Sequence, residues 1–216
     1  MTLIQVALDT LDFNDTINLA RQVAPYVDIV ELGTPCIKYN GVGIVKRLKS
    51  VVATTNTMVL ADLKTMDAGY YESLPFYEAG ADICTVLGAA DFGTIEGVIK
   101  AAKETNKKVQ VDLINVSDKQ SVVKHAIEAG ADILGIHTGL DQQARGVTPF
   151  ADLASVSNMG NGIVRISVAG GINSSTVAQA IAAGANIIVA GAAIYGAADP
   201  VAAAKAIRDA VDAVTV

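Results

Sequence analysis

The hexapeptide EAGADI at residues 78–83 returns unchanged at residues 128–133, and a third copy reads AAGANI at residues 182–187. Each copy combines small helix-ending residues, a glycine that takes up a left-handed backbone cheaply, and an isoleucine that opens the next apolar run. The second copy begins 50 residues after the first, and the third begins 54 residues after the second. The chain therefore repeats a unit in which one helix ends and one buried strand begins.

Each interval between copies holds two apolar runs and two helical patterns, so one strand–helix unit takes about 25 residues. Units of this length predict eight strands rich in Val, Ile and Leu, as in a covered parallel sheet. Strict alternation of strand and helix predicts an α/β fold, and eight units favour a closed (β/α)8 TIM barrel over an open doubly wound sheet. Without any linker, residues 1–216 form one predicted domain. The predicted strands are 3–9, 27–32, 57–63, 83–87, 108–113, 132–137, 163–168 and 187–190.

Residues typical of helix starts lie between the apolar runs. Asp118 precedes one helical pattern, and Thr148 with Pro149 precedes another. Asn173 with Ser174 is expected to open a third helix, and Asp199 with Pro200 the last. These positions predict where the chain leaves each strand end and turns into a covering helix.

The bulk composition excludes several classes of protein. Hydrophobic residues make up 51% and charged residues 18%, which predicts a packed core rather than disorder. The net charge of -6 argues against nucleic acid as a partner, although a single phosphate needs only a local cradle of backbone N–H groups. Cys36 and Cys84 are expected in the core. No apolar run approaches the ~20 residues of a spanning helix, so we expect a cytoplasmic protein without a membrane partner.

Ionisable side chains gather at the ends of the predicted strands. Parallel strands of a barrel all end on one face, and active sites of barrel enzymes lie there. One such residue alone fits a structural ion-pair network, but the whole set predicts a functional site. The set comprises Asp9, Glu31, Asp62, Lys64, Asp112 and His137, with Asp67 just beyond the third strand.

The residue types in this set suggest roles. Asp62 and Lys64, two apart on one strand, should point to the same side, where the Lys64 ammonium can neutralise a developing enolate oxygen. Glu31 and Asp62 offer the oxygen ligands that Mg²⁺ takes, with Mn²⁺ as an alternative. His137 is expected to act as an acid or base. The other histidine, His125, falls inside a helical pattern and is expected to face solvent.

Two members of the set have a second interpretation. Asp67 fits a cap on the following helix, and Asp9 fits an orienting contact to Lys64 without touching substrate. Both are nonetheless grouped here with the catalytic candidates Lys64 and His137.

Glycine-bearing turns follow the last two strands. Gly170 and Gly171 follow the seventh strand, and Gly191 with Ala192 follows the eighth. Barrels often bind phosphate at these two turns through backbone N–H groups, so we predict a phosphate site there. Tight packing of the turns is the alternative.

The motifs carry a family resemblance over essentially the whole chain. DLKTMD at residues 62–67 matches the Asp-x-Lys-x-x-Asp signature of the orotidine 5′-monophosphate decarboxylase superfamily. ELGTP at residues 31–35 and GAAIYGAADP at residues 191–200 resemble the 3-hexulose-6-phosphate synthase family. The resemblance implies an aldehyde-lyase that condenses D-ribulose 5-phosphate with formaldehyde to a 3-hexulose 6-phosphate through a metal-stabilised 1,2-enediolate.

The resemblance also implies roles for single residues. Glu31 and Asp62 match the metal ligands, and Lys64 matches the group that stabilises the enediolate. Asp67 matches a residue that reaches the neighbouring site of a homodimer. Asp9 and His137 fall on other polar positions of the family site, and Asp112 and Thr34 are expected to contact substrate.

Other activities stay open. The related 3-keto-L-gulonate 6-phosphate decarboxylases carry an Arg where this chain has Leu140, and this departure argues against decarboxylation. They carry another Arg where this chain has Ala192, so the resemblance implies that phosphate is held mainly by backbone groups. A pentulose-phosphate isomerase or epimerase is a further alternative, and a non-catalytic phosphosugar-binding barrel is the remotest. The segment 138–148, with Gly139 and Gly146, is either a mobile cover over the site or an ordinary surface loop.

Overall fold

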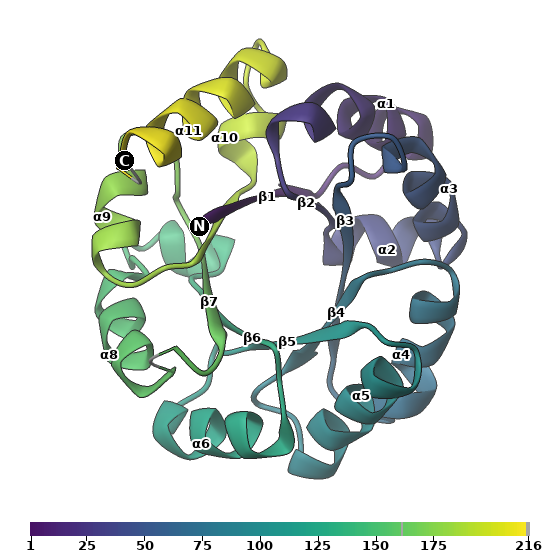
Figure 1. The fold of residues 1–216 in the computed structure, drawn as a ribbon, viewed down its shortest axis with the longest axis vertical. Coiled ribbons are helices and arrows are strands. Elements are labelled where there is room, and N and C mark those ends of the chain that lie inside the picture. Colours follow the sequence, from purple (N-terminus) through teal and green to yellow (C-terminus); the bar gives the residue numbers. More distant parts are fainter. Residues whose placement is uncertain (161, 215–216) are drawn as a thin grey trace.

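The computed structural model describes residues 1–160 and 162–214 and forms a closed barrel of eight parallel strands (Figure 1). Neighbouring strands pair in chain order, and the last strand pairs with the first. The predicted barrel and all eight predicted strands are thereby confirmed. The strands are β1 (Leu3–Leu8), β2 (Ile29–Leu32), β3 (Met58–Thr65), β4 (Ile83–Leu87), β5 (Lys108–Asp112), β6 (Ile133–His137), β7 (Arg165–Ala169) and β8 (Ile187–Ala190).

Helices surround the strands as an outer ring, and the C-terminal helix lies beside the first helix to complete it (Figure 1). Several strand–helix connections carry an additional short helix, which the sequence pattern does not predict. The helices are α1 (Phe13–Val23), η1 (Ala24–Tyr26), α2 (Thr34–Asn40), α3 (Gly43–Val52), α4 (Gly69–Glu78), α5 (Phe92–Glu104), α6 (Lys119–Ala129), α7 (Leu140–Gln143), α8 (Phe150–Gly160), α9 (Val177–Ala182), α10 (Ala192–Tyr195) and α11 (Pro200–Val214).

Two of the four predicted helix starts are confirmed by side-chain caps, and a third, at Thr148 and Pro149, directly precedes α8, which begins at Phe150. The Asp118 carboxylate accepts a hydrogen bond from Ser121 N at 3.1 Å, and Asp199 accepts one from Ala202 N at 2.9 Å. The start expected at Asn173 is wrong, because α9 begins only at Val177. The Asn173 carboxamide instead accepts from Ser175 N and closes a turn before the helix.

The repeated hexapeptide behaves as predicted. The φ value is 112° for Gly80, 95° for Gly130 and 101° for Gly184, all in the left-handed region. Each of these glycines lies between a helix and the next strand. A side chain at these positions would be strained, which explains why each copy has glycine.

The residue after each repeated Ala-Gly-Ala forms a two-point clamp on the preceding strand. Asp82 accepts a hydrogen bond from Val59 N at 2.9 Å, while its own N–H donates to Val59 O at 2.8 Å. Asp132 and Asn186 do the same on β5 and β7, and Asp28 does so on β1. We call these four residues the N-terminal clamps, because each lies just before an even-numbered strand.

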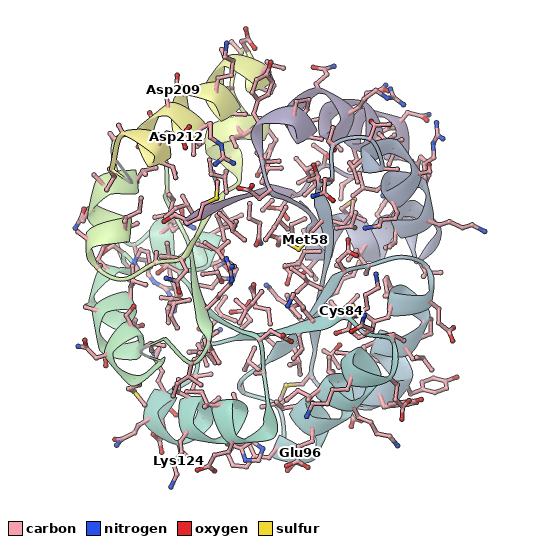
Figure 2. The ribbon with its side chains drawn as sticks, viewed as in Figure 1. Met58, Cys84, Glu96, Lys124, Asp209 and Asp212 are labelled. Carbon is pink, nitrogen blue, oxygen red and sulfur yellow. The ribbon has the colours of Figure 1, made fainter. Side chains whose placement is uncertain are left out.

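Side chains fill both the shell between strands and helices and the barrel interior, where Met58 is labelled (Figure 2). The larger cluster lies between the strands and the helices. The interior cluster consists of Ile29, Leu60, Ile83, Ile133, Ile187 and Val189. This interior cluster lies beside the inward polar residues Gln5 and Gln110, which pair with Ile29 and Ile133. Within the described ranges, none of the helices is both long enough and apolar enough to span a membrane.

Candidate active site

A cavity of about 530 Å³ opens at the C-terminal ends of the strands. It brings together the six predicted ionisable groups, which lie up to 128 residues apart in the chain, from Asp9 to His137, and Asp141 and Arg145 line it too. Thr34 lines it as well, so the predicted convergence on one face is confirmed. The predicted lining residues are Asp9, Glu31, Thr34, Asp62, Lys64, Asp112 and His137.

Strand periodicity explains how the site is positioned. Successive side chains of a strand point to opposite faces, so every second residue of a barrel strand points inward. In β2, Ile29 joins the interior cluster and Glu31 lines the cavity, whereas Val30 packs outward under the helices. In β3, Leu60 and Asp62 follow the same order. In both strands the inward series thus begins apolar and ends ionisable.

Lys64 is the centre of the charge network. Its Nζ donates to Asp62 Oδ2 and to Asp112 Oδ2, both at 2.8 Å. Burial alone would lower the pKa of Lys64, but the two carboxylates hold that pKa well above its ordinary value. The side chain is therefore a permanent cation fixed between two carboxylates.

The backbone at Lys64 departs from the expected regular strand. Lys64 has a φ of 47°, in the left-handed region that non-glycine residues rarely adopt. The predicted contact between Asp62 and Lys64 is confirmed, but simple alternation along a strand is the wrong reason for it. The contact forms across an irregular segment in which the pairing of β3 with β4 shifts register.

Asp112 links Lys64 to His137. His137 Nδ1 lies 3.1 Å from Asp112 Oδ2, and Ile114 N donates to Asp112 Oδ1 at 2.9 Å. Burial would raise the pKa of Asp112, but the His137 hydrogen bond and the Lys64 charge lower it to about 2. The carboxylate therefore stays ionised and orients the His137 ring.

The surroundings of Glu31 disfavour its ionised form. Burial, followed by the charge of Asp62, raises the pKa of Glu31 well above 4.5. Gln5 Nε2 donates to Glu31 Oε2 at 2.6 Å, whereas Gln5 Oε1 is buried and has no hydrogen-bond partner within residues 1–160 and 162–214. Buried oxygens with surplus negative charge are the donor set that a hard divalent cation prefers.

Glu31 and Asp62 could supply only part of the ligand set of a divalent cation. No group of three or more His, Cys, Asp or Glu side chains within the described chain is arranged to hold a metal ion. Mg²⁺ commonly takes only one or two carboxylates and completes its shell with water and substrate oxygens, so Glu31 and Asp62 suffice. Asp62 also accepts from Thr34 Oγ1 at 2.8 Å and from Lys64, so one of these donors must yield to a cation there.

Asp9 is held close to the start of α2. A Cβ atom on Gly33 would come within 2.0 Å of Asp9 Oδ1, so this glycine makes room for the carboxylate. Burial and the charge of Asp62 raise the pKa of Asp9, while Lys64 and His137 oppose that rise. The ion pairs of Lys64 in the described structure go to Asp62 and Asp112, so an orienting contact from Asp9 to Lys64 is wrong.

Asp67 lies outside the cavity and is exposed. Its carboxylate accepts from the adjacent Ala68 N at 2.7 Å, and Ala68, with a φ of 51°, is itself the N-cap of α4. The alternative of Asp67 as the cap of this helix is therefore wrong. Its role at a neighbouring site stays a prediction.

The predicted phosphate-site residues line a second cavity of about 300 Å³, which shares Asp9, His137 and Leu140 with the first. Gly170 has a φ of 115°, and a Cβ there would lie 2.6 Å from Thr138 O, so tight packing also requires this glycine. Their phosphate-binding role stays a prediction. All four predicted residues, Gly170, Gly171, Gly191 and Ala192, line the second cavity.

Sequence reasoning missed a polar layer beneath the ionisable groups. Gln5, Gln110 and Ser167 are buried and line the main cavity. Thr85 is buried as well and hydrogen-bonds both Asp62 and Lys64. The sequence does carry a signal for them, because each is a polar residue at an inward strand position with an apolar residue on either side.

Three smaller expectations have clear outcomes. Cys36 and Cys84 are buried, as predicted. His125 does not simply face solvent, because its ring stacks on Phe92 at 3.8 Å between centroids, in the contact between α5 and α6. Segment 138–148 carries α7, with Gln143 Nε2 donating to Thr138 O at 2.7 Å. Whether it moves stays a prediction.

Comparisons with known proteins agree with this geometry. Residues 2–207 match the model of the orotidine 5'-phosphate decarboxylase / HUMPS family. A 3-hexulose-6-phosphate synthase from Methylomonas aminofaciens is 60% identical over 179 residues, which cover 83% of this chain and 84% of that protein.

Solved structures give the same result. The crystal structure of 3-hexulose-6-phosphate synthase from Salmonella typhimurium is similar with a TM-score of 0.92 and 42% identity, covering 98% of this chain and 99% of that one. The structure of 3-keto-L-gulonate-6-phosphate decarboxylase from Vibrio cholerae has a TM-score of 0.86 and 29% identity, with 98% of both chains covered.

Proposed function

This chain belongs to the orotidine 5'-phosphate decarboxylase / HUMPS family, and from that premise we propose that it condenses D-ribulose 5-phosphate with formaldehyde to a 3-hexulose 6-phosphate. It is a lyase-type enzyme, and its high identity to a 3-hexulose-6-phosphate synthase favours this reaction over the decarboxylation of a sugar acid phosphate. The observation that carries the proposal is the chain of contacts from Asp62 through Lys64 and Asp112 to His137 inside one cavity.

The reaction needs a carbon acid to lose a proton. We assign His137 as the base that removes a proton from C1 of the pentulose phosphate. Asp112 accepts from the ring at Nδ1 and stabilises its protonated form, since a pKa lowered to about 2 keeps the carboxylate ionised near neutral pH. The other ring nitrogen, Nε2, is the one left to face the substrate.

Lys64 stabilises the negative charge that this proton transfer creates. Its ammonium group is held by two carboxylates, so it reaches the enediolate oxygen without reorganisation during the reaction. The nucleophilic C1 then forms a bond to the carbon of formaldehyde. The carbonyl oxygen of formaldehyde becomes an alkoxide and takes up the proton that His137 holds, which returns the base to its starting state.

A divalent cation, Mg²⁺ or Mn²⁺, held by Glu31 and Asp62, would supply a Lewis acid that makes the C1 proton more acidic. Thr34 keeps its own role there, because its hydroxyl fixes one oxygen of Asp62. The substrate phosphate would bind the second cavity, where Gly170, Gly171 and Gly191 allow close approach of backbone N–H groups.

We also propose a homodimer in which Asp67 completes the neighbouring site. Its exposed position outside its own cavity supports a role beyond its own barrel. Mixing an inactive Lys64→Ala protein with an inactive Asp67→Ala protein would test this, because a mixed dimer assembles one intact site. Activity that stays at the level of the separate variants would overturn the shared site.

The reaction itself is tested by following ribulose 5-phosphate with and without formaldehyde, before and after exhaustive chelation. We expect consumption that requires both formaldehyde and a restored divalent cation. Consumption of the sugar phosphate at the same rate without formaldehyde would contradict the aldolase proposal and favour an isomerase or epimerase. Full activity after chelation would contradict the proposed role of a divalent cation.

A further inference from the structure

Strand β3 contains a local excess of residues next to the active site. Ala61 pairs with Cys84 and Thr65 pairs with Val86, so β3 advances by four residues while β4 advances by two. Three residues of β3, from Asp62 to Lys64, therefore face the single residue Thr85. Such bulges leave a backbone group without its ladder partner and re-aim a side chain.

The backbone at this bulge is strained. Five non-glycine residues of the described chain have a positive φ, and three of them are asparagines, which tolerate that conformation. The other two, Lys64 and Ala68, lie on either side of Asp67. A left-handed lysine persists only where its surroundings hold it in place.

The hydroxyl group of Thr85 fills the gap left by the bulge. Its Oγ1 accepts from Lys64 N at 2.9 Å and donates to Asp62 Oδ1 at 2.7 Å. Thr85 is 1% exposed, so water does not substitute easily for either bond. Because the oxygen donates its only proton to Asp62, its lone pairs are left to accept the Lys64 N–H.

We propose that Thr85 is a positioning residue for the reaction, since its hydroxyl holds Lys64 in the left-handed conformation that aims the ammonium between Asp62 and Asp112. Thr85 itself does not touch substrate. The proposal rests on the proposed function only in that Lys64 is the group that acts on the enediolate.

Three variants test the proposal. Thr85→Val keeps the shape and removes the hydroxyl, and Thr85→Ser keeps the hydroxyl and removes a methyl group. Thr65→Val is the matched control, because Thr65 Oγ1 is buried on the same strand as Lys64 and lacks a hydrogen-bond partner among residues 1–160 and 162–214. Steady-state kinetics, thermal unfolding and a crystal structure of each folded variant are measured.

We expect Thr85→Val to lower kcat by about 100-fold, the loss that a displacement of about 1 Å at a catalytic group produces, with KM nearly unchanged. Thr85→Ser should retain most of kcat, and Thr65→Val should match the parent protein. In the Thr85→Val crystal structure, the φ of Lys64 should leave the left-handed region.

Two results would overturn the proposal: an unchanged Lys64 backbone with near-normal kcat in Thr85→Val, or equal losses in Thr85→Val and Thr85→Ser. The structural measurement does not depend on the reaction. If the parent protein shows no formaldehyde-dependent turnover, the proposed function fails while the φ of Lys64 still decides whether Thr85 holds it.

Discussion

Aspartate side chains lie at both mouths of the barrel, before β2, β4 and β6 at one end and at the ends of β1, β3 and β5 at the other. At the N-terminal mouth, each N-terminal clamp accepts a hydrogen bond from one backbone N–H of the preceding strand. The three aspartates among the clamps each pair with separate Lys or Arg side chains. At the C-terminal mouth, Asp62 and Asp112 share one cation, Lys64.

The same residue type therefore has two kinds of surroundings. The clamps repeat with nearly identical geometry, which is what a structural element needs, and the fourth of them is the neutral Asn186. The C-terminal groups differ from strand to strand: burial raises the pKa of Glu31, whereas His137 and Lys64 lower the pKa of Asp112 despite its burial. In this barrel the clamp residues that repeat are structural, and the ionisable residues that differ from strand to strand form the candidate site. The following experiments try to break this distinction.

The largest effect is expected from Lys64→Ala. Loss of the cation that Asp62 and Asp112 share removes the group that neutralises the enediolate, so kcat should fall by about 10²–10³-fold, as for other lost transition-state donors. Lys49→Ala is the matched control at the N-terminal mouth, because Asp82 keeps Lys107. Steady-state assays that find similar losses in both variants would contradict the distinction between the mouths.

A smaller effect, on stability alone, is expected at an N-terminal clamp. Asp82→Ala leaves Val59 N without its acceptor and should lower the free energy of unfolding by about 1–3 kcal/mol. Asp82→Asn keeps an acceptor, as Asn186 does naturally, and should cost less than about 1 kcal/mol because the lost ion pairs are partly exposed. Urea unfolding measures both. In both variants kcat per folded molecule should stay unchanged. Equal losses of stability would mean that the charge of Asp82, and not its bond to the backbone, provides the stabilisation.

Glu31→Gln should stabilise the protein when divalent cations are absent. Burial and Asp62 raise the pKa of Glu31, so the folded state binds this proton more tightly than the unfolded state. The free energy of unfolding therefore falls as the pH rises from about 4.5 through the raised value, because ionised Glu31 opposes folding.

Glu31→Gln removes this loss and should raise the melting temperature at pH 7 by about 2–4 °C, the shift that about 1 kcal/mol gives in a domain of this size. Adding Mg²⁺ should then stabilise the parent protein more than the variant. If Glu31→Gln melts at a lower temperature than the parent protein without divalent cations, the prediction that ionised Glu31 opposes folding is wrong.

The smallest effect is expected from Lys108→Met. The Lys108 Nζ lies 3.5 Å from Asp132 Oδ1, and the side chain is 54% exposed, so the ion pair should contribute less than about 1 kcal/mol. The clamp bond from Val109 N to Asp132 remains in this variant. A clearly larger loss in urea unfolding, especially one that high salt abolishes, would show that the rim charges hold the N-terminal mouth.

Much of this organisation can be predicted from the sequence because it depends on local rules. The recurring hexapeptide predicts the helix-to-strand unit, and Gly130 takes the left-handed backbone that this unit requires. The strand-end residues follow because parallel strands end on one face. The helix at Asn173 is misplaced because its side chain serves equally well to close a turn, and composition does not distinguish the two uses.

Residue spacing by itself determined the fold, the strand-end set and the two glycine turns, since a period of two along a strand and a chain-order barrel leave few other arrangements. Only the tertiary structure decided that Lys64 bonds Asp112 rather than Asp9, that Asp67 stays outside its own cavity, and that Thr85 supports the bulge. Those outcomes depend on register between strands that are distant in the chain, and a shift of a single residue between β3 and β4 changes which side chains meet.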